Sequence, residues 1–310
     1  MSGRAFGKVI LLGEHAVVYG VPAIAVGIDR GASAVARAGT GTSTLSLGGG
    51  VVSAGDGSDL GRAFADVLAA CGATEPLEVA AETDLPAGAG LGCSAALGVA
   101  IARAIDEHLG HRPSASETFE RAMAWERVFH GNPSGVDATV AARGGCIRFV
   151  RGKGVEPVRV GKPLSLAIGY TGLPSSTKSM VESVARLRDR RPEVVEKAFE
   201  GVRSLVENAR LCIEAGDHVG LGKLLDLNQM ILAGVFVSSA EIERMCSLAR
   251  DAGALGAKLT GAGGGGCVIA LLSGAPDAVL AAWTREGFTG FATVVDAEAR
   301  HEDAGAPSHP

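Results

Sequence analysis

The sequence has 310 residues, 47% of them hydrophobic and 20% charged, which is the balance of a soluble globular protein rather than a disordered or fibrous one. Its net charge of −5 provides no broad basic surface, so nucleic acid is not expected as a partner. No apolar segment approaches the roughly 18 residues of a membrane-spanning helix, and the first residues carry Glu and His where a signal peptide needs more apolar length, so we expect a cytoplasmic protein that does not bind membranes.

Hydrophobic periodicity predicts mainly strands in the first third of the chain and mainly helices after it. Segments rich in β-branched residues are typical of strands, and apolar residues three or four positions apart are typical of helices. Ser114 and Glu117 have the spacing of a capping box at the start of one helix. The expected elements are strands over 5–12, 23–29 and 32–38, a helix over 58–71, a strand over 76–83, helices over 94–110 and 114–130, a short helix starting at 136, and a strand over 145–150.

The segment 151–163 carries charges, glycines and prolines, which favours a domain boundary there. We place the boundary near residue 162, which gives domains over 1–162 and 163–310. Helices mixed with antiparallel strands predict an α+β fold rather than a regular βαβ series. From about residue 301 the chain has too little apolar content to pack and is expected to be mobile. The second domain is expected to contain a strand over 164–172, several amphipathic helices between about 176 and 252, two strands joined by a glycine loop within 257–272, a helix over 275–287 and a strand over 291–297.

The segment DLPAGAGLGCSAAL, residues 84–97, leads from a predicted strand into a predicted helix through a glycine-dense loop. Gly88, Gly90 and Gly92 allow a tight turn that brings several N–H groups together at the start of the helix, where the helix dipole also favours an anion such as phosphate. Ser94 would either cap that helix or ligate Mg²⁺. The loop matches neither a Walker loop, nor GxGxxG, nor GxSxG. A flexible connector with an ordinary serine cap is the alternative.

Two carboxylates flank the turn Gly-Asn-Pro-Ser-Gly. Glu126 lies near the end of one predicted helix and Asp137 just inside the next, eleven positions later (137 minus 126), so the turn can fold them towards each other. Phosphoryl transfer needs two such groups, one that holds the metal and one that orients or accepts the proton of the attacking hydroxyl. In the alternative interpretation, Ser134 and Asp137 form a capping motif and Glu126 is a solvated helix residue.

A lysine on the first strand is a third candidate. Lys8 lies on an otherwise apolar strand, and Glu14 and His15 occupy the turn that follows it. A cation there would lower the pKa of a nearby hydroxyl or neutralise charge developing on a transferring phosphoryl group. The alternative is a lysine at a strand edge beside a polar turn.

Two later segments carry weaker signals. Ser175, Ser176 and Thr177 are natural helix caps, and the mobile cation Lys178 follows them, so the plain interpretation is a helix start. The glycines of 261–266 offer a second loop rich in backbone amides between two apolar strands, or only a hairpin connection.

Taken in chain order, these segments resemble the motifs of the GHMP kinase superfamily over about residues 5 to 270. Within that superfamily the first motif is most similar to that of the mevalonate kinases. The resemblance implies an ATP- and Mg²⁺-dependent phosphotransferase that acts on the C5 hydroxyl of mevalonate, with an N-terminal ribosomal-protein-S5-domain-2-like domain and a C-terminal ferredoxin-like domain. A homodimer is compatible with the family. The matching motifs are GEHAVVYG, PAGAGLGCSAA, HGNPSGVD, SSTK and KLTGAGGGG.

The resemblance also implies a role for each matching residue. Asp137 would be the catalytic base that takes the proton of the acceptor hydroxyl, and Lys8 would stabilise the ionised base and the developing charge. The Mg²⁺ ligands would be Ser94 and Glu126. The residues that contact the substrate or maintain the transfer geometry would be Glu14, His15 and Thr177. The ATP phosphates would be wrapped by Gly88, Ala89, Gly90, Leu91, Gly92, Cys93 and Ser94, supported by the loop 261–266.

Cys93 departs from the family pattern, which usually has a serine at this position. The change removes a hydroxyl donor from the phosphate loop but keeps the backbone N–H, so nucleotide binding should survive, weakened and open to thiol reagents. No CxxC pair and no histidine at finger spacing accompany the cysteines, so reduced thiols are expected rather than a zinc site or disulfides. The six cysteines are Cys71, Cys93, Cys146, Cys212, Cys246 and Cys267.

Two other functions are compatible with these motifs. The first is a related kinase that acts on phosphomevalonate or a sugar; GEHAVVYG weighs against it, and a phosphorylated acceptor would need more cations than Lys8 and Lys178 supply. The second is a nucleotide-binding regulator that has lost turnover. It is disfavoured because the base, metal and lysine positions are all present.

Overall fold

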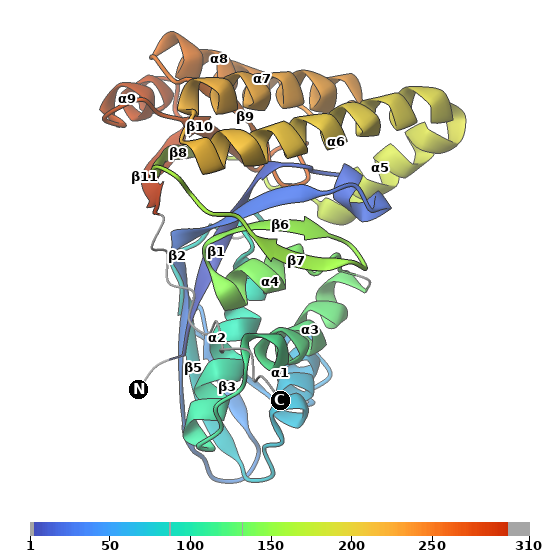
Figure 1. Cartoon of the computed structure of the whole chain (residues 1–310). Helices are drawn as coiled ribbons and strands as arrows, with labels where there is room; N and C mark the ends of the chain where they lie inside the picture. The colour runs from blue at the N-terminus through green and yellow to red at the C-terminus, as the bar shows by residue number, and fades with distance from the viewer. Residues whose placement is uncertain (1–2, 87, 132, 297–310) are drawn as a thin grey trace, which may run out of the picture.

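The computed structural model describes residues 3–86, 88–131 and 133–296, and within them it has the predicted α+β fold, with helices packed on two sheets (Figure 1). The strands are β1 (Gly3–Leu12), β2 (Ala23–Ala38), β3 (Thr44–Leu47), β4 (Gly50–Ser53), β5 (Leu77–Thr83), β6 (Cys146–Val150), β7 (Gly154–Pro157), β8 (Leu164–Tyr170), β9 (Gly256–Thr260), β10 (Cys267–Leu271) and β11 (Thr289–Val295). The helices are a 3-10 turn (Ala16–Tyr19), α1 (Asp59–Cys71), α2 (Cys93–His108), α3 (Ala115–His130), α4 (Val136–Arg143), α5 (Thr177–Arg190), α6 (Pro192–Ala215), α7 (His218–Gly234), α8 (Ala240–Asp251) and α9 (Asp277–Arg285).

The first sheet contains, within the described residues, seven strands in the order β4-β3-β5-β2-β6-β7, with β1 paired to β2 beside this path. Helices α1 to α4 lie with this sheet in the lower body of the molecule in Figure 1. Pairing is antiparallel except between β3 and β5, which run parallel. The short strands β3, β4 and β7 were not predicted, because each has only four residues and carries little periodic signal.

The strands predicted over 23–29 and 32–38 are in fact one 16-residue strand, β2. The glycine between them does not break the strand but marks a bulge, because the register with β1 shifts where Phe6 pairs with Gly31 and Gly7 pairs with Ile28. A Cβ at Gly31 would lie 1.9 Å from the carbonyl oxygen of Ala5, so only glycine allows this approach. The bulge lets β2 bend and pair with β5 and β6 at its two ends.

The second sheet is antiparallel throughout, in the order β11-β8-β10-β9, and α5 to α9 lie with it in the upper body of Figure 1. All of these strands and helices fall where periodicity predicted them. The capping box at the start of α3 is confirmed, since the Ser114 side chain accepts from the Glu117 N–H and the Glu117 side chain accepts from the Ser114 N–H. The first sheet ends at Pro157 and the second begins at Leu164, while the domain division near residue 162 stays a prediction. The predicted mobile tail lies outside the described residues.

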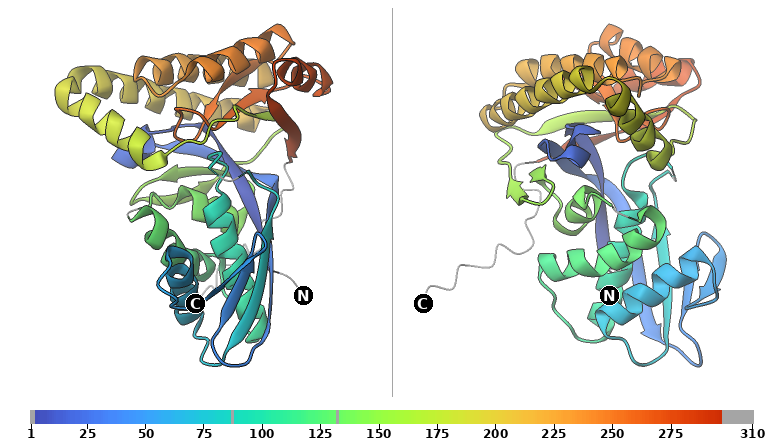
Figure 2. Two further views of the ribbon diagram at one scale, coloured as in Figure 1. Left: turned by 180° about the vertical axis from the view of Figure 1, so that it is seen from behind. Right: turned by 90° about the vertical axis from the view of Figure 1, so that its right-hand side faces the viewer.

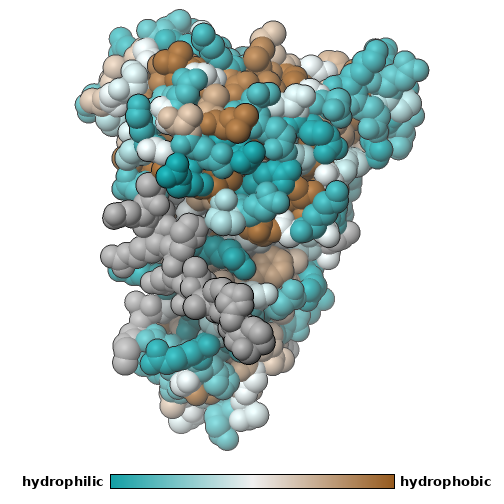
Figure 3. Space-filling model, viewed as in Figure 1, coloured by the Kyte–Doolittle hydropathy of each residue, from teal (hydrophilic) through white to brown (hydrophobic). Residues whose placement is uncertain are grey.

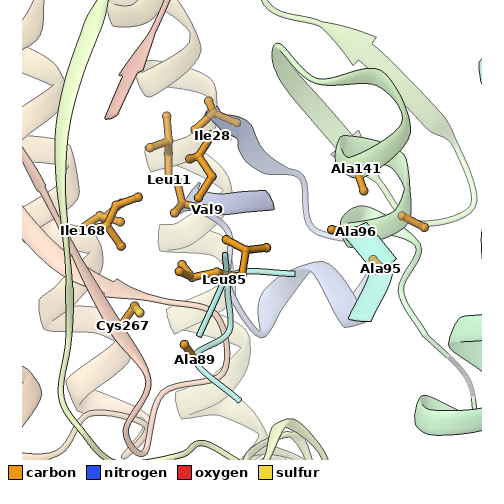
Figure 4. Packing of buried hydrophobic residues seen from close by; sticks show 14 of the residues in the cluster. Val9, Leu11, Ile28, Leu85, Ala89, Ala95, Ala96, Ala141, Ile168 and Cys267 are labelled. Atoms are coloured by element: carbon orange, nitrogen blue, oxygen red, sulfur yellow. The ribbon is translucent and has the colours of Figure 1, made fainter. Parts of the chain in front are cut away.

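The larger of two hydrophobic clusters among the described residues extends through both bodies of the molecule. Figure 4 shows a part of it at their junction, where Ile168 and Cys267 of the second sheet approach Leu85 and Ala89 of the first glycine loop. The alanine-rich helix α2 is buried along most of its length. This burial anchors the start of α2, and with it the glycine loop that precedes it.

β1 and β2 reach from the lower body up to the helices of the upper body, as Figures 1 and 2 show. The contact is hydrogen-bonded, because Thr260 Oγ1 accepts from the Ile10 N–H at 2.9 Å and donates to the Ile10 carbonyl at 3.1 Å. On the face drawn in Figure 3, hydrophilic residues predominate and hydrophobic ones form small patches. Within the described part of the chain, no helix is both long enough and apolar enough to cross a membrane.

Candidate active site

The first glycine loop lies between β5 and α2 and opens onto the N-terminus of α2. Gly92 is the N-cap residue in the left-handed conformation, with φ of 76°, and no cap bond from a side chain is described there. The alternative in which Ser94 caps this helix is therefore wrong. A Cβ at Gly92 would lie 3.0 Å from Lys8 Cγ, so glycine lets the lysine stem pass against the loop. The positive end of the α2 dipole is left for an anion.

The second glycine loop, 261–266, joins β9 to β10 and packs directly on the first. A Cβ at Gly261 would lie 3.3 Å from the Gly90 carbonyl oxygen, which shows how closely the two backbones approach. Ser175 connects the loops, because its N–H donates to the Gly88 carbonyl at 3.2 Å and its hydroxyl donates to the Gly263 carbonyl. Sequence reasoning treated Ser175 as one of three helix caps, but the cap of α5 is Ser176.

Ser175→Ala is expected to weaken ATP binding about threefold to tenfold, because the loops lose one hydrogen bond with a net contribution of about 1 kcal/mol. Calorimetric titration with ATP measures this. Ser176→Ala is the matched control: it removes the cap of α5, lowers stability by about 1 kcal/mol and leaves the contact between the loops intact. Equal ATP affinities in the two variants would show that Ser175 does not order the two glycine loops for ATP binding.

Ser94 and Glu126 meet in the first turn of α2. The Ser94 hydroxyl donates to Glu126 Oε1 at 2.5 Å, and it accepts from the Trp125 indole N–H at 3.2 Å. Glu126 is only 3% exposed, so its interpretation as a solvated helix residue is wrong. Its other carboxylate oxygen, Oε2, lies 3.8 Å from His130 Nε2. The two predicted metal ligands thus form one oxygen-rich pair beside the glycine loop.

Burial raises the pKa of Glu126 above its usual range, and nearby Asp137 raises it further, while the Ser94 hydrogen bond, His130 and Lys8 act in the opposite direction. A cation competes with a proton for this carboxylate, so the raised pKa moves the competition to higher pH. We expect Mg²⁺-dependent nucleotide binding to weaken as the pH falls through the raised pKa, beginning above the ordinary glutamate range. Titration of ATP in Mg²⁺ across pH 4.5–8 measures the effect. The part of the dependence that Glu126 causes should be lost in Glu126→Gln, while the part that comes from protonation of the terminal phosphate of ATP remains; a profile identical to that of the wild type would assign the dependence to other groups.

Lys8 and Asp137 form the second cluster. Lys8 Nζ lies 3.0 Å from Asp137 Oδ1 and donates to the Gly90 carbonyl at 3.0 Å. The lysine side chain is 3% exposed and the aspartate 39%. Gly135, not Ser134, is the N-cap of α4, so Asp137 does not belong to a serine capping motif. The ion pair therefore joins the first glycine loop to an aspartate that faces a pocket.

That pocket has a volume of about 510 Å³ and contains both carboxylates, Glu126 and Asp137. Thr177 lines this pocket, while its predicted contact with substrate stays untested, and Lys178, predicted only to follow a helix start, lines the pocket as well. Arg151 also lines the pocket and was missed, because it follows the end of β6 within the charged segment assigned to a domain boundary; it donates to the Val18 carbonyl at 3.2 Å. Apolar side chains complete the wall: Val18, Met123, Phe129 and Val181.

Glu14 and His15 make contacts of a different kind from those predicted. The Glu14 carboxylate forms a fully buried ion pair with Lys258 of β9. His15 Nε2 donates to the Ala262 carbonyl at 2.8 Å, and burial lowers the pKa of this histidine. Neither side chain lines the pocket that contains Asp137. Both connect the end of β1 to the second body, and their contact with substrate stays a prediction.

Cys93 lies on the first turn of α2, with its Sγ 3.8 Å from Thr83 Oγ1. Burial raises the pKa of the Cys93 thiol, against the effect of the Thr83 hydrogen bond. The thiolate is the reactive form, so the predicted sensitivity to thiol reagents is not supported. All six cysteines are free thiols.

Comparison with known proteins shows which proteins this chain is similar to. Two family models match the chain, the N-terminal domain of the GHMP kinases over residues 59–145 and their C-terminal domain over 205–289. The chain is 35% identical to the mevalonate kinase of Thermococcus gammatolerans over 94% of its own length and 95% of the relative's. It is 36% identical to the mevalonate kinase of Aeropyrum pernix, with 86% of each chain covered. The crystal structure of L. major mevalonate kinase in complex with R-mevalonate superposes with a TM-score of 0.86 at 28% identity, covering 96% of this chain and 97% of that one.

Proposed function

The chain belongs to the GHMP kinase family, and from this premise we propose that it transfers the γ-phosphoryl group of ATP to the C5 hydroxyl of mevalonate, giving 5-phosphomevalonate and ADP. Membership of the family makes it an alcohol-acceptor phosphotransferase that uses ATP. One observation carries the finer proposal: the Lys8–Asp137 pair lies between the first glycine loop and a pocket large enough for a small acceptor. The homodimer expected from the resemblance stays a prediction.

In this proposal Asp137 accepts the proton of the acceptor hydroxyl. Its carboxylate is partly exposed to the pocket, while the buried Lys8 holds its other side. Lys8 also contacts the glycine loop, so its charge lies where negative charge develops on the transferring phosphoryl group. Phosphoryl transfer depends mainly on positioning and charge neutralisation, and this pair can supply both.

The protein fits a Mg²⁺ ion held by Ser94 and Glu126. Both offer oxygen ligands within 2.5 Å of each other. Mg²⁺ is usually bound by one or two carboxylates, with substrate phosphates and water completing the shell. In the described residues no group of three or more His, Cys, Asp or Glu side chains could hold a metal. When bound, Mg²⁺ would neutralise part of the negative charge of the phosphates.

Other residues that line the pocket suit the rest of the acceptor. Mevalonate has a carboxylate, a methyl-bearing carbon and a primary hydroxyl. Arg151 and Lys178 supply positive charge for the carboxylate, and Thr177 supplies a hydroxyl. The apolar part of the wall, which includes Met123 and Phe129, suits the methyl-bearing carbon. We therefore assign Arg151 and Lys178 to the acceptor carboxylate and Asp137 to the C5 hydroxyl.

A coupled ADP-release assay over several acceptors tests this function. With saturating ATP and Mg²⁺, mevalonate should give acceptor-dependent ADP release far above phosphomevalonate, galactose and homoserine. Preference for one of the other acceptors would replace mevalonate as the substrate and keep the kinase. Tight ATP binding without ADP release on any acceptor would instead support a nucleotide-binding regulator.

A further inference from the structure

The Ser94 hydroxyl makes two hydrogen bonds that together use most of its capacity. It donates its single hydrogen to Glu126 and accepts from the indole N–H of Trp125. A hydroxyl has one hydrogen and two lone pairs. After both bonds are made, one lone pair of Ser94 is left for an external ligand.

The direction of both bonds follows from the chemistry of the partners. An indole N–H can only donate, so the Ser94 oxygen must be the acceptor towards Trp125. An ionised carboxylate can only accept, so the Ser94 hydrogen must point to Glu126. The orientation of the Ser94 hydroxyl is therefore determined by its two neighbours. Rotation of the hydroxyl would break the hydrogen bonds to Glu126 and Trp125.

Trp125 is itself held in place from two sides. Its side chain is 1% exposed and lies on the backbone of α2 at Gly98, where a Cβ would come within 2.9 Å of two indole carbons. One turn further along α3, the ring of Phe129 lies 5.4 Å away, centroid to centroid, at 55°. Close packing on both sides fixes the indole N–H, and a fixed donor can hold Ser94.

We propose that Trp125 is a positioning residue for the metal of the bound nucleotide. Through its indole N–H it keeps the Ser94 hydrogen on Glu126 and leaves one Ser94 lone pair for the metal. This inference rests on the part of the proposed function in which Ser94 and Glu126 hold Mg²⁺. It does not depend on which acceptor is phosphorylated.

Trp125→Phe tests the proposal because it removes the N–H and keeps an aromatic ring. The matched control is Trp283→Phe, since Trp283 is the other tryptophan, is also fully buried, and donates its indole N–H to the Met245 carbonyl at 2.9 Å in the second body. Binding of a non-hydrolysable ATP analogue is measured by calorimetry, in Mg²⁺ and in EDTA. Trp125→Phe should weaken binding in Mg²⁺ about fivefold, the scale of one hydrogen bond, and leave binding in EDTA unchanged. Trp283→Phe should change neither.

A double-mutant cycle with Ser94→Ala isolates the coupling between the two residues. In the Ser94→Ala background, Trp125→Phe should no longer affect binding in Mg²⁺. Gly98→Ala, which pushes on the indole, should reproduce the Mg²⁺-specific loss if Trp125→Phe does not fold. The proposal is overturned by a loss that is equal in Mg²⁺ and EDTA, by one that Trp283→Phe shares, or by one that persists without the Ser94 hydroxyl. If the variants show the Mg²⁺-specific coupling but the wild-type protein does not phosphorylate mevalonate, the acceptor assignment is wrong and this inference is unaffected.

Discussion

Asp137→Asn is expected to lower kcat on mevalonate by about 10²-fold or more while ATP binding stays close to that of the wild type. The amide keeps the shape of the side chain but cannot accept the hydroxyl proton, and a positioned base typically contributes at least this much. The ATP contacts that we propose come mainly from the glycine loops and the start of α2, and Asp137 belongs to neither, since it lies on α4. Single-turnover kinetics with saturating ATP and mevalonate separate the chemical step from product release.

Two comparisons sharpen this prediction. Asp189→Asn on α5 makes the same chemical change at an exposed position outside the pocket and should leave kcat unchanged. Lys8→Met should lower kcat as well, because the transferring phosphoryl group loses its neighbouring cation. A kcat within a few-fold of the wild type in Asp137→Asn would remove this aspartate from the role of base.

Lys258→Met is expected to lower the free energy of unfolding by about 3–5 kcal/mol, a large fraction of the stability of an ordinary domain. The side chains of Lys258 and Glu14 are both fully buried, and Glu14 Oε2 has no hydrogen-bond partner among the described residues. Burial raises the pKa of Glu14 and lowers the pKa of Lys258, so each charge is maintained against a desolvation penalty by its partner. Urea unfolding measured by fluorescence and by circular dichroism gives the loss.

The double variant Glu14→Leu, Lys258→Met tests whether the loss of stability comes from a buried charge without a partner. Replacing both partners with apolar side chains removes the uncompensated carboxylate, so the double variant should be more stable than Lys258→Met alone. If the free energy of unfolding of Lys258→Met lies within about 1 kcal/mol of the wild-type value, the ion pair does not stabilise the contact between β9 and the end of β1.

Much of the fold follows from local signals in the sequence. Long periodic segments such as α2 and α3 were predicted close to their ends, because apolar spacing, and for α3 the serine N-cap, are local features. The glycine of β2 was misread as a break, since whether a glycine ends a strand or forms a bulge depends on the partner strand. β3 and β4 were missed because four-residue strands are recognised by their pairing rather than by their composition.

The residues of the site that belong to sequence motifs could be predicted, and those outside the motifs could not. Lys8, Ser94, Glu126 and Asp137 were named from the sequence, and the fold brings them together as two adjacent pairs. Their individual roles stay proposals. Arg151 carried no motif and became visible only through the pocket it lines.

Two contacts that hold the site together join residues that are distant in the chain. Ser175 lies 88 positions from Gly263 of the second glycine loop, and Lys258 of β9 lies 244 positions from Glu14, which follows β1. No local pattern reports such pairs. For the same reason, the pairing of Glu14 with Lys258 could not be predicted from the turn GEH, whose predicted contact with substrate stays untested.

The most direct test is a crystal structure with a non-hydrolysable ATP analogue, Mg²⁺ and mevalonate bound together. We predict that the metal will be bound by the Ser94 hydroxyl and the Glu126 carboxylate, and that the C5 hydroxyl of mevalonate will lie within hydrogen-bonding distance of Asp137. A metal that contacts neither ligand, or an acceptor hydroxyl directed away from this aspartate, would contradict the assignment of the four residues to one phosphoryl-transfer centre.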